Sequence, residues 1–212
     1  MTMPDLLRKI NYKPKPYSYK LRIPPEYHSQ ILALLNKLVP HYKNLIADII
    51  KQSGGTIKFP VDTDFMVRYL EGYNIDYVPF FDDSGEKPED GHFDIVDIKQ
   101  GHFAVFYNTY YPPKRQRATK IHETWHIIQL MDMPFRVFID ELVLDTELPP
   151  DVIELLLERA TEKATFMYLI PNDYLRQKFK ETQDIKTLSD YFQASEESLY
   201  YAIREAGLNY VQ

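Results

Sequence analysis

The chain has 212 residues, a net charge of −6 and a hydrophobic fraction of 44%. This composition excludes a disordered chain, and the acidic balance gives little electrostatic support to a direct nucleic-acid partner. The absence of cysteine excludes disulfides and cysteine-ligated zinc. The first residues lack the apolar core of a signal peptide, and no run of about 18 apolar residues occurs, so we expect a cytoplasmic protein with no membrane partner.

Residues 1–55 are expected to form an N-terminal arm followed by helices. Repeated prolines in residues 1–24 indicate an extended arm. Apolar residues then recur at helical spacing from Glu26 to Ser53. Pro40 is expected to divide or kink this helical region, and Gly54-Gly55 to end it.

Residues 56–180 are expected to form the main domain, which begins with a small sheet. Strands are predicted where β-branched and aromatic residues cluster between turn residues, at Thr56–Phe59, Ile75–Phe80, Phe93–Ile98 and Phe103–Tyr107. The last two are expected to pair as a hairpin, so we predict an antiparallel sheet. A helix capped by Asp62 or Thr63 is expected between the first two strands.

The stretch from Arg115 to Leu130 contains the pattern H-E-x-x-H, formed by His122, Glu123 and His126. On a helix, residues i and i+4 share one face, so both imidazoles can supply two of the three protein ligands of a zinc ion. Glu123 then lies where a carboxylate can take a proton from a metal-bound water. The alternative is a polar helix face that carries two histidines by chance.

A catalytic zinc site needs a third protein ligand and an open position. Glu158 and Glu162 follow on a predicted helix that Pro149-Pro150-Asp151 opens and Pro171 closes. Because they are i and i+4, one carboxylate can bind the metal while the other holds a ligand histidine by its second ring nitrogen. A solvated acidic helix face is the alternative.

These two stretches resemble the ImmA/IrrE family of zinc metallopeptidases. The matching residues are Arg115, Arg117, Thr119, His122, Glu123, His126, Glu158, Leu169 and Pro171. The resemblance implies a mainly helical α+β, zincin-like metallopeptidase core with helical extensions at both ends. It also implies a Zn²⁺ cofactor held by His122, His126 and Glu158, with Glu123 as general base. Glu162 stands where the family has Asp or Asn, and we expect it to support a ligand histidine.

Trp125 departs from this family pattern, which has a small glycine just before the second motif histidine. Ala164 departs in the opposite direction, because it replaces a phenylalanine. We expect a compensated exchange in which the Trp125 ring fills space beside Ala160 and Ala164, since cores tolerate changes that conserve volume. The alternative is that Trp125 narrows the cleft and impairs activity.

Other polar residues near the motif have secondary roles in this interpretation. Arg115 and Arg117 flank the motif, and the resemblance implies that they form a structural salt bridge. His92 and His102 stand at the starts of the hairpin strands and are minor candidates for metal or substrate contacts.

Residues 181–212 are expected to form a C-terminal hairpin of two short helices. Ser195 is a suitable N-cap for the second helix, although Ser198 occupies the position where a full capping box has Glu or Gln. This hairpin resembles the family's C-terminal segment, which looks like half of a helix-turn-helix. Its acidic balance argues against reading DNA, so we expect a packing or partner-docking element.

The sequence therefore favours a zinc-dependent endopeptidase. By resemblance its substrate is a regulatory protein such as a helix-turn-helix repressor. The main alternative is a non-catalytic regulator, with structural zinc or no metal, that docks a repressor partner. The third hypothesis is a nucleic-acid-binding domain. The two helices expected in residues 181–212 favour it, and the net charge of −6 opposes it.

Overall fold

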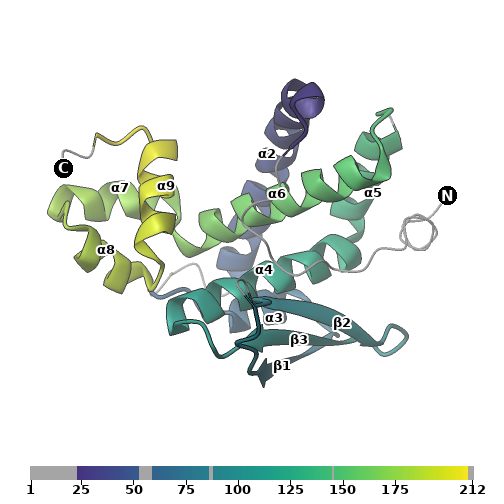
Figure 1. The fold of residues 1–212 in the computed structure, drawn as a ribbon, viewed down its shortest axis with the longest axis horizontal. Coiled ribbons are helices and arrows are strands. Elements are labelled where there is room, and N and C mark those ends of the chain that lie inside the picture. Colours follow the sequence, from purple (N-terminus) through teal and green to yellow (C-terminus); the bar gives the residue numbers. More distant parts are fainter. Residues whose placement is uncertain (1–22, 53–58, 86–87, 145, 210–212) are drawn as a thin grey trace.

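The computed structural model describes residues 23–52, 59–85, 88–144 and 146–209, and it shows a mainly helical α+β fold with one small sheet (Figure 1). In chain order the elements are η1 (Pro25–Tyr27), α2 (His28–Gln52), α3 (Asp64–Tyr69), β1 (Asn74–Phe80), β2 (Gly91–Asp97), β3 (His102–Asn108), α4 (Pro113–Met131), α5 (Met133–Leu144), α6 (Pro150–Leu169), α7 (Asn172–Glu181), α8 (Ile185–Phe192) and α9 (Glu196–Glu205). The expected arm and most of the expected strand Thr56–Phe59 lie outside the described residues.

Helix α2 is continuous, so the expectation that Pro40 divides it is wrong. Proline inside a helix removes one backbone hydrogen bond and costs about 3 kcal/mol. Pro40 lies on the exposed face, whereas the buried face carries Ile31, Leu34, Leu38, Tyr42, Leu45, Ile46 and Ile49. Burial of a Leu or Ile side chain contributes about 1.5–3 kcal/mol, so the packed face outweighs the single lost bond.

The sheet is mixed, which corrects the antiparallel sheet expected from the sequence. Its strand order is β1-β3-β2, with β2 and β3 antiparallel as predicted and β1 parallel to β3. Strand β3 takes the centre because Phe103, Ala104 and Val105 are buried in succession, a pattern typical of a strand covered on both faces. Strand β2 is left as an edge, beside α4.

Gly91 allows β2 to approach both of its neighbours closely. A Cβ atom at Gly91 would lie 2.4 Å from the Phe106 carbonyl oxygen and 2.5 Å from Thr119 Cγ2. Only glycine therefore fits at the point where the strand meets β3 and α4 together.

Helix α4 lies between the sheet and α6, and it packs against both (Figure 1). Every side chain from Ile121 to Leu130 is buried, which is unusual for a helix with this many polar residues. Helix α2 packs on α6, so α2, α4 and α6 form one layered core around the motif.

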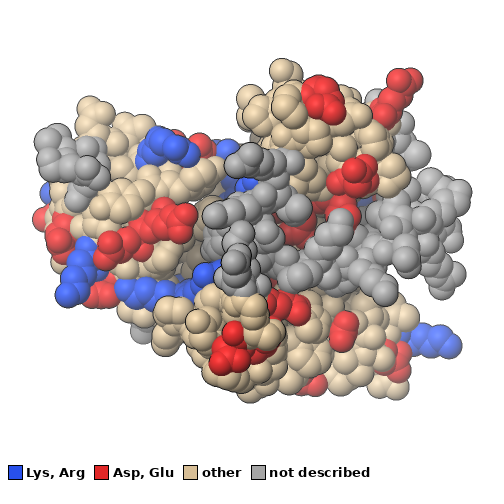
Figure 2. Space-filling view, in the orientation of Figure 1, with Lys and Arg blue, Asp and Glu red and all other residues tan. Residues whose placement is uncertain are grey.

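The C-terminal part contains α7 in addition to the two tail helices expected from the sequence. Ser195 caps α9 as predicted, because its side chain accepts a hydrogen bond from Ser198 N at 3.1 Å. The two hydroxyls also form a hydrogen bond with each other at 2.7 Å. Acidic and basic side chains are interspersed over α7–α9 on the face seen in Figure 2.

Candidate metal centre

Helix α4 places the two motif histidines side by side inside the protein. Pro113 occupies the first turn, where its missing N–H and fixed φ suit a helix start. His122 and His126 follow one turn apart, and their Nε2 atoms lie 3.1 Å from each other. Their side chains are only 1% and 3% exposed, so neither is an ordinary surface histidine.

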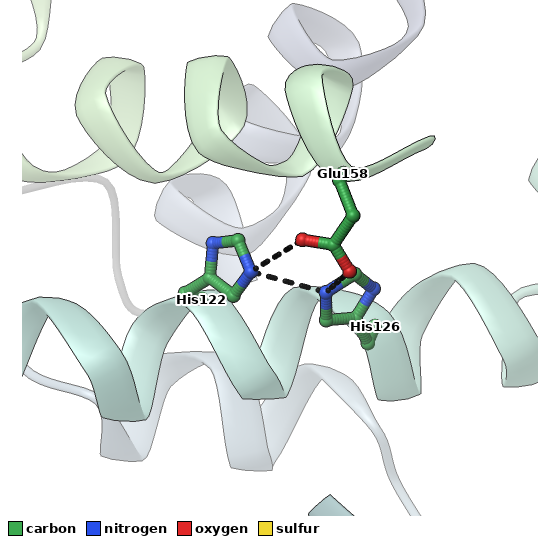
Figure 3. A group of neighbouring side chains, drawn as sticks. All are labelled: His122, His126 and Glu158. Carbon is green, nitrogen blue, oxygen red and sulfur yellow. Dashed lines mark hydrogen bonds and ion pairs between the residues drawn. The ribbon is translucent and has the colours of Figure 1, made fainter. Parts of the chain in front are cut away.

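Helix α6 brings Glu158 to the same point from the opposite side (Figure 3). Its Oε2 lies 3.3 Å from His122 Nε2, and its Oε1 lies 3.3 Å from His126 Nε2. The carboxylate is 11% exposed and faces both imidazoles. The structure therefore joins the three residues predicted as ligands, although 32 residues separate His126 from Glu158.

The geometry of this group fits a metal ion. Ligand atoms held about 2.0–2.1 Å from a tetrahedral ion lie about 3.3 Å from each other. The Nε2–Nε2 distance of 3.1 Å is close to this edge length, and each histidine Nε2 lies 3.3 Å from a different oxygen of the Glu158 carboxylate. His122, His126 and Glu158 can thus hold a metal ion together, with ligand atoms all within 4.8 Å of one another.

The charges of the three groups are strongly coupled. Burial lowers the pKa of His126, but the Glu158 carboxylate outweighs this effect and raises it to about 9. Burial lowers the pKa of His122 to about 4, against the hydrogen bond to Glu158. Burial raises the pKa of Glu158, but His126 and the hydrogen bonds from both histidines bring it well below its usual range. These residues therefore favour a positive charge beside the Glu158 carboxylate.

Glu123 is buried beside the ligands, with 2% of its surface exposed. Burial raises the pKa of Glu123 to about 8, although the nearby charge of His126 acts in the opposite direction. A carboxyl group with a pKa near neutrality can both accept and return a proton. Its role as general base stays a prediction.

Glu162 has a different partner from the one expected. Its Oε2 accepts a hydrogen bond from Arg159 Nη1 at 2.8 Å, within α6. The second ring nitrogen of His126 instead lies 3.2 Å from Gln129 Oε1. Gln129 was not predicted as this partner. Its position three residues after His126, one turn along the same helix, is the only feature of the sequence that indicates the contact.

Trp125 is completely buried. Its ring meets Tyr168 of α6 edge-on, with centroids 6.1 Å apart, and Tyr42 of α2 at 5.6 Å. Ala160 and Ala164 are buried on the same helix as Tyr168. This placement agrees with a tryptophan that fills space against α6, while its direct contact with the two alanines stays a prediction.

The two arginines of the motif have different roles. Arg115 forms the predicted salt bridge, a two-point contact with Asp90 at 2.7 and 2.9 Å. Arg117 instead donates to backbone carbonyls, those of Phe192 and Gln193 at 3.1 and 3.2 Å and that of Val61. It therefore fastens the end of α8 to α4.

His92 and His102 pair with carboxylates away from the three ligands. His92 Nδ1 lies 2.5 Å from Glu89 Oε1, and His102 Nε2 lies 2.7 Å from Asp76 Oδ2. The structure brings neither histidine into the metal-ligand group. The neighbouring Phe93 does reach the centre, because its ring stacks over His126 with centroids 6.0 Å apart.

Comparisons with known proteins give little further information. No protein-family model and no curated protein matches the chain. One solved structure that matches the chain is a Mycobacterium tuberculosis transcriptional regulator, at a TM-score of 0.46 and 12% sequence identity. The match covers 92% of this chain and 48% of that regulator, so this chain spans about half its length. Within the described ranges, no helix has the length and apolarity needed to cross a membrane.

Proposed function

We propose that the protein is a zinc-dependent endopeptidase. The observation that carries this proposal is the convergence of His122, His126 and Glu158, whose ligand atoms lie within 4.8 Å of one another, with the carboxyl group of Glu123 buried beside them. Two histidines and one glutamate are a ligand set of catalytic zinc, which keeps a fourth position for water or substrate. His122, His126 and Glu158 would hold a zinc ion there, which would supply a water of lowered pKa and polarisation of a peptide carbonyl.

Glu123 is the proton carrier of this proposal. As a carboxylate it accepts the proton of the attacking water, and as an acid it returns the proton to the leaving amine. Burial raises the pKa of Glu123 to about 8, and a cation beside this carboxyl group would lower the pKa and favour the ionised form.

The substrate backbone is proposed to lie along β2. This strand is one of the two edges of the described sheet and packs against α4, and Phe93 of β2 stacks over His126. An exposed edge strand can pair with an extended peptide through backbone hydrogen bonds. Ile95 and Val96, both about half exposed, then offer apolar contacts to substrate side chains.

The proposed substrate is a regulatory protein, such as a helix-turn-helix repressor. This part of the proposal is supported by the resemblance of the motif residues to the ImmA/IrrE family. The alternative is a non-catalytic regulator that binds the same partner with structural zinc or no metal. It predicts a function that does not depend on Glu123.

A Glu123→Gln variant tests the catalytic proposal. The amide keeps the size of the side chain but cannot accept the proton, and loss of a general base lowers a rate by about 10²–10⁴-fold. We expect the zinc-loaded variant to keep its metal and to lose cleavage of a peptide library analysed by mass spectrometry. Glu141→Gln, on the exposed face of α5, is the matched control and should cleave like the wild type. Equal cleavage by Glu123→Gln would refute the mechanism.

A further inference from the structure

Gln129 connects three helices at the metal centre. Its Oε1 lies 3.2 Å from His126 Nδ1 within α4. Its Nε2 lies 2.6 Å from Thr161 Oγ1 of α6 and also contacts the Tyr42 hydroxyl of α2. Gln129, Thr161 and Tyr42 are all at most 5% exposed, so bulk water does not compete for these bonds.

The direction of these hydrogen bonds follows from Thr161. Its Oγ1 lies 2.9 Å from the Leu157 carbonyl oxygen, which can only accept, so the single hydroxyl proton of Thr161 is directed there. Thr161 must then accept from Gln129, whose amino group faces Thr161 and Tyr42. The carbonyl Oε1 of Gln129 consequently faces His126, and His126 Nδ1 is the donor.

The position of this proton decides which nitrogen of His126 can bind a metal. A neutral imidazole has one N–H, so a proton on Nδ1 leaves the lone pair on Nε2. Nε2 is the atom that lies 3.1 Å from His122 Nε2 and 3.3 Å from Glu158. A reversed amide would offer its amino group to Nδ1 and move the ring proton to Nε2, where it would exclude the cation.

We propose that Gln129 is a positioning residue that holds His126 in its metal-binding tautomer, and that Thr161 and Tyr42 set the orientation of the Gln129 amide. This inference rests on the metal centre proposed above. It assigns a function to a buried polar network that reaches from α2 to α6, which the H-E-x-x-H pattern does not contain.

The first test is the Zn²⁺ affinity of variants, measured by competition with a chromophoric chelator. Gln129→Met has a similar length but no acceptor, and loss of a partner behind a ligand weakens metal binding by about 10–100-fold. Gln129→Glu keeps an acceptor oxygen towards His126 and should restore most of the affinity. The double variant Tyr42→Phe/Thr161→Val leaves Gln129 in place but frees its amide, and it should also bind Zn²⁺ more weakly.

The second test separates positioning from general destabilisation. In the zinc-loaded, ¹⁵N-histidine-labelled wild type, we expect an NMR signal for an His126 Nδ1–H that exchanges slowly with water. This protection should disappear in Gln129→Met and return in Gln129→Glu. Protection and affinity unchanged in Gln129→Met would overturn this inference while leaving the metal centre intact. Absence of Zn²⁺ binding by the wild type would instead contradict the metal centre, and this inference with it.

Discussion

At the scale of single residues, the candidate metal centre places one carboxylate and two histidines inside the protein, where their charges must balance. Glu158 is mostly buried between two histidines that are almost fully buried. A buried carboxylate needs a compensating charge, because desolvation of an isolated ion costs several kcal/mol or more. Either a proton on His126 or a divalent cation supplies that charge. Proton and metal therefore compete for the same nitrogen lone pair.

The salt bridge between Arg115 and Asp90 gives a prediction about stability and its pH dependence. Asp90 is 2% exposed, and burial raises its pKa against the effect of Arg115. Arg115→Ala should lower the free energy of unfolding by about 1.5–3 kcal/mol, the range for hydrogen bonds to charged groups. Without the guanidinium the pKa of folded Asp90 rises further. The defect should therefore be small at acidic pH and grow as pH rises through this pKa.

Urea denaturation at several pH values measures this effect, with Arg115→Lys as the control. Lysine keeps the charge but has no planar fork for a two-point contact, so its defect should be smaller. A defect in Arg115→Ala that is constant from acidic to neutral pH would show that Asp90 is not the group responsible.

The sequence predicted which three side chains come together better than it predicted their surroundings. H-E-x-x-H fixes His122 and His126 by helical geometry alone, and a second i, i+4 pair limits the third ligand to Glu158 or Glu162. Which of the two faces α4 depends on the rotation of α6, and packing sets that rotation. The partner of His126 could not be predicted. The orientation of Gln129 depends on its hydrogen bonds to Thr161 and Tyr42, which lie on other helices.

At the scale of elements, the candidate metal centre lies at the contact between α4 and α6. The two histidines of α4 meet Glu158 of α6 at this interface, where Trp125 also packs against Tyr168. Two close-packed helices transmit small volume changes, because protein interiors have few voids. The residues that fill the interface therefore also control the distance between the histidines and Glu158.

A double-mutant cycle tests the proposed volume exchange between Trp125 and Ala164. Trp125→Ala should destabilise the protein by about 3–5 kcal/mol through a large cavity. Ala164→Phe alone should cost about 1–3 kcal/mol through overpacking. If the two side chains share one space, the double variant should be more stable than the sum predicts, by about 0.5–3 kcal/mol. Additive free energies from chemical denaturation would reject the exchange.

The elements themselves were predicted unevenly. Local patterns located the strands, the motif helix and the cap at Ser195, because each depends on neighbouring residues. The parallel placement of β1 was missed, since it depends on which edge of β3 the chain reaches after a loop. Of the two outcomes expected at Pro40, division of α2 is wrong, because tertiary packing outweighs a local helix-breaking residue.

At the scale of the whole molecule, a bound ion would fasten α4 to α6, and α2 packs on the latter helix. A ligand that binds only the folded state adds stability, about 2.7 kcal/mol when its concentration is 100 times its Kd. We expect a chelator to lower the melting temperature by about 5–10 °C, on the scale of about 2–4 °C per kcal/mol for a domain of this size.

The Glu158→Gln variant shows whether this stabilisation arises at the proposed centre. It removes the charged ligand, so its melting temperature should respond little to added Zn²⁺ or chelator. Glu154→Gln, one turn earlier on α6, should keep the full response of the wild type. A zinc-dependent shift that survives in Glu158→Gln would place the ion elsewhere.

The most direct measurement is the zinc K-edge X-ray absorption spectrum of the full chain loaded with one equivalent of Zn²⁺. We predict four-coordinate zinc with nitrogen and oxygen ligands at about 2.0–2.1 Å. Outer-shell scattering should indicate two imidazoles, with one of them lost in His126→Ala. A spectrum of hydrated zinc without imidazole scattering would contradict the assignment of His122, His126 and Glu158 as a metal centre.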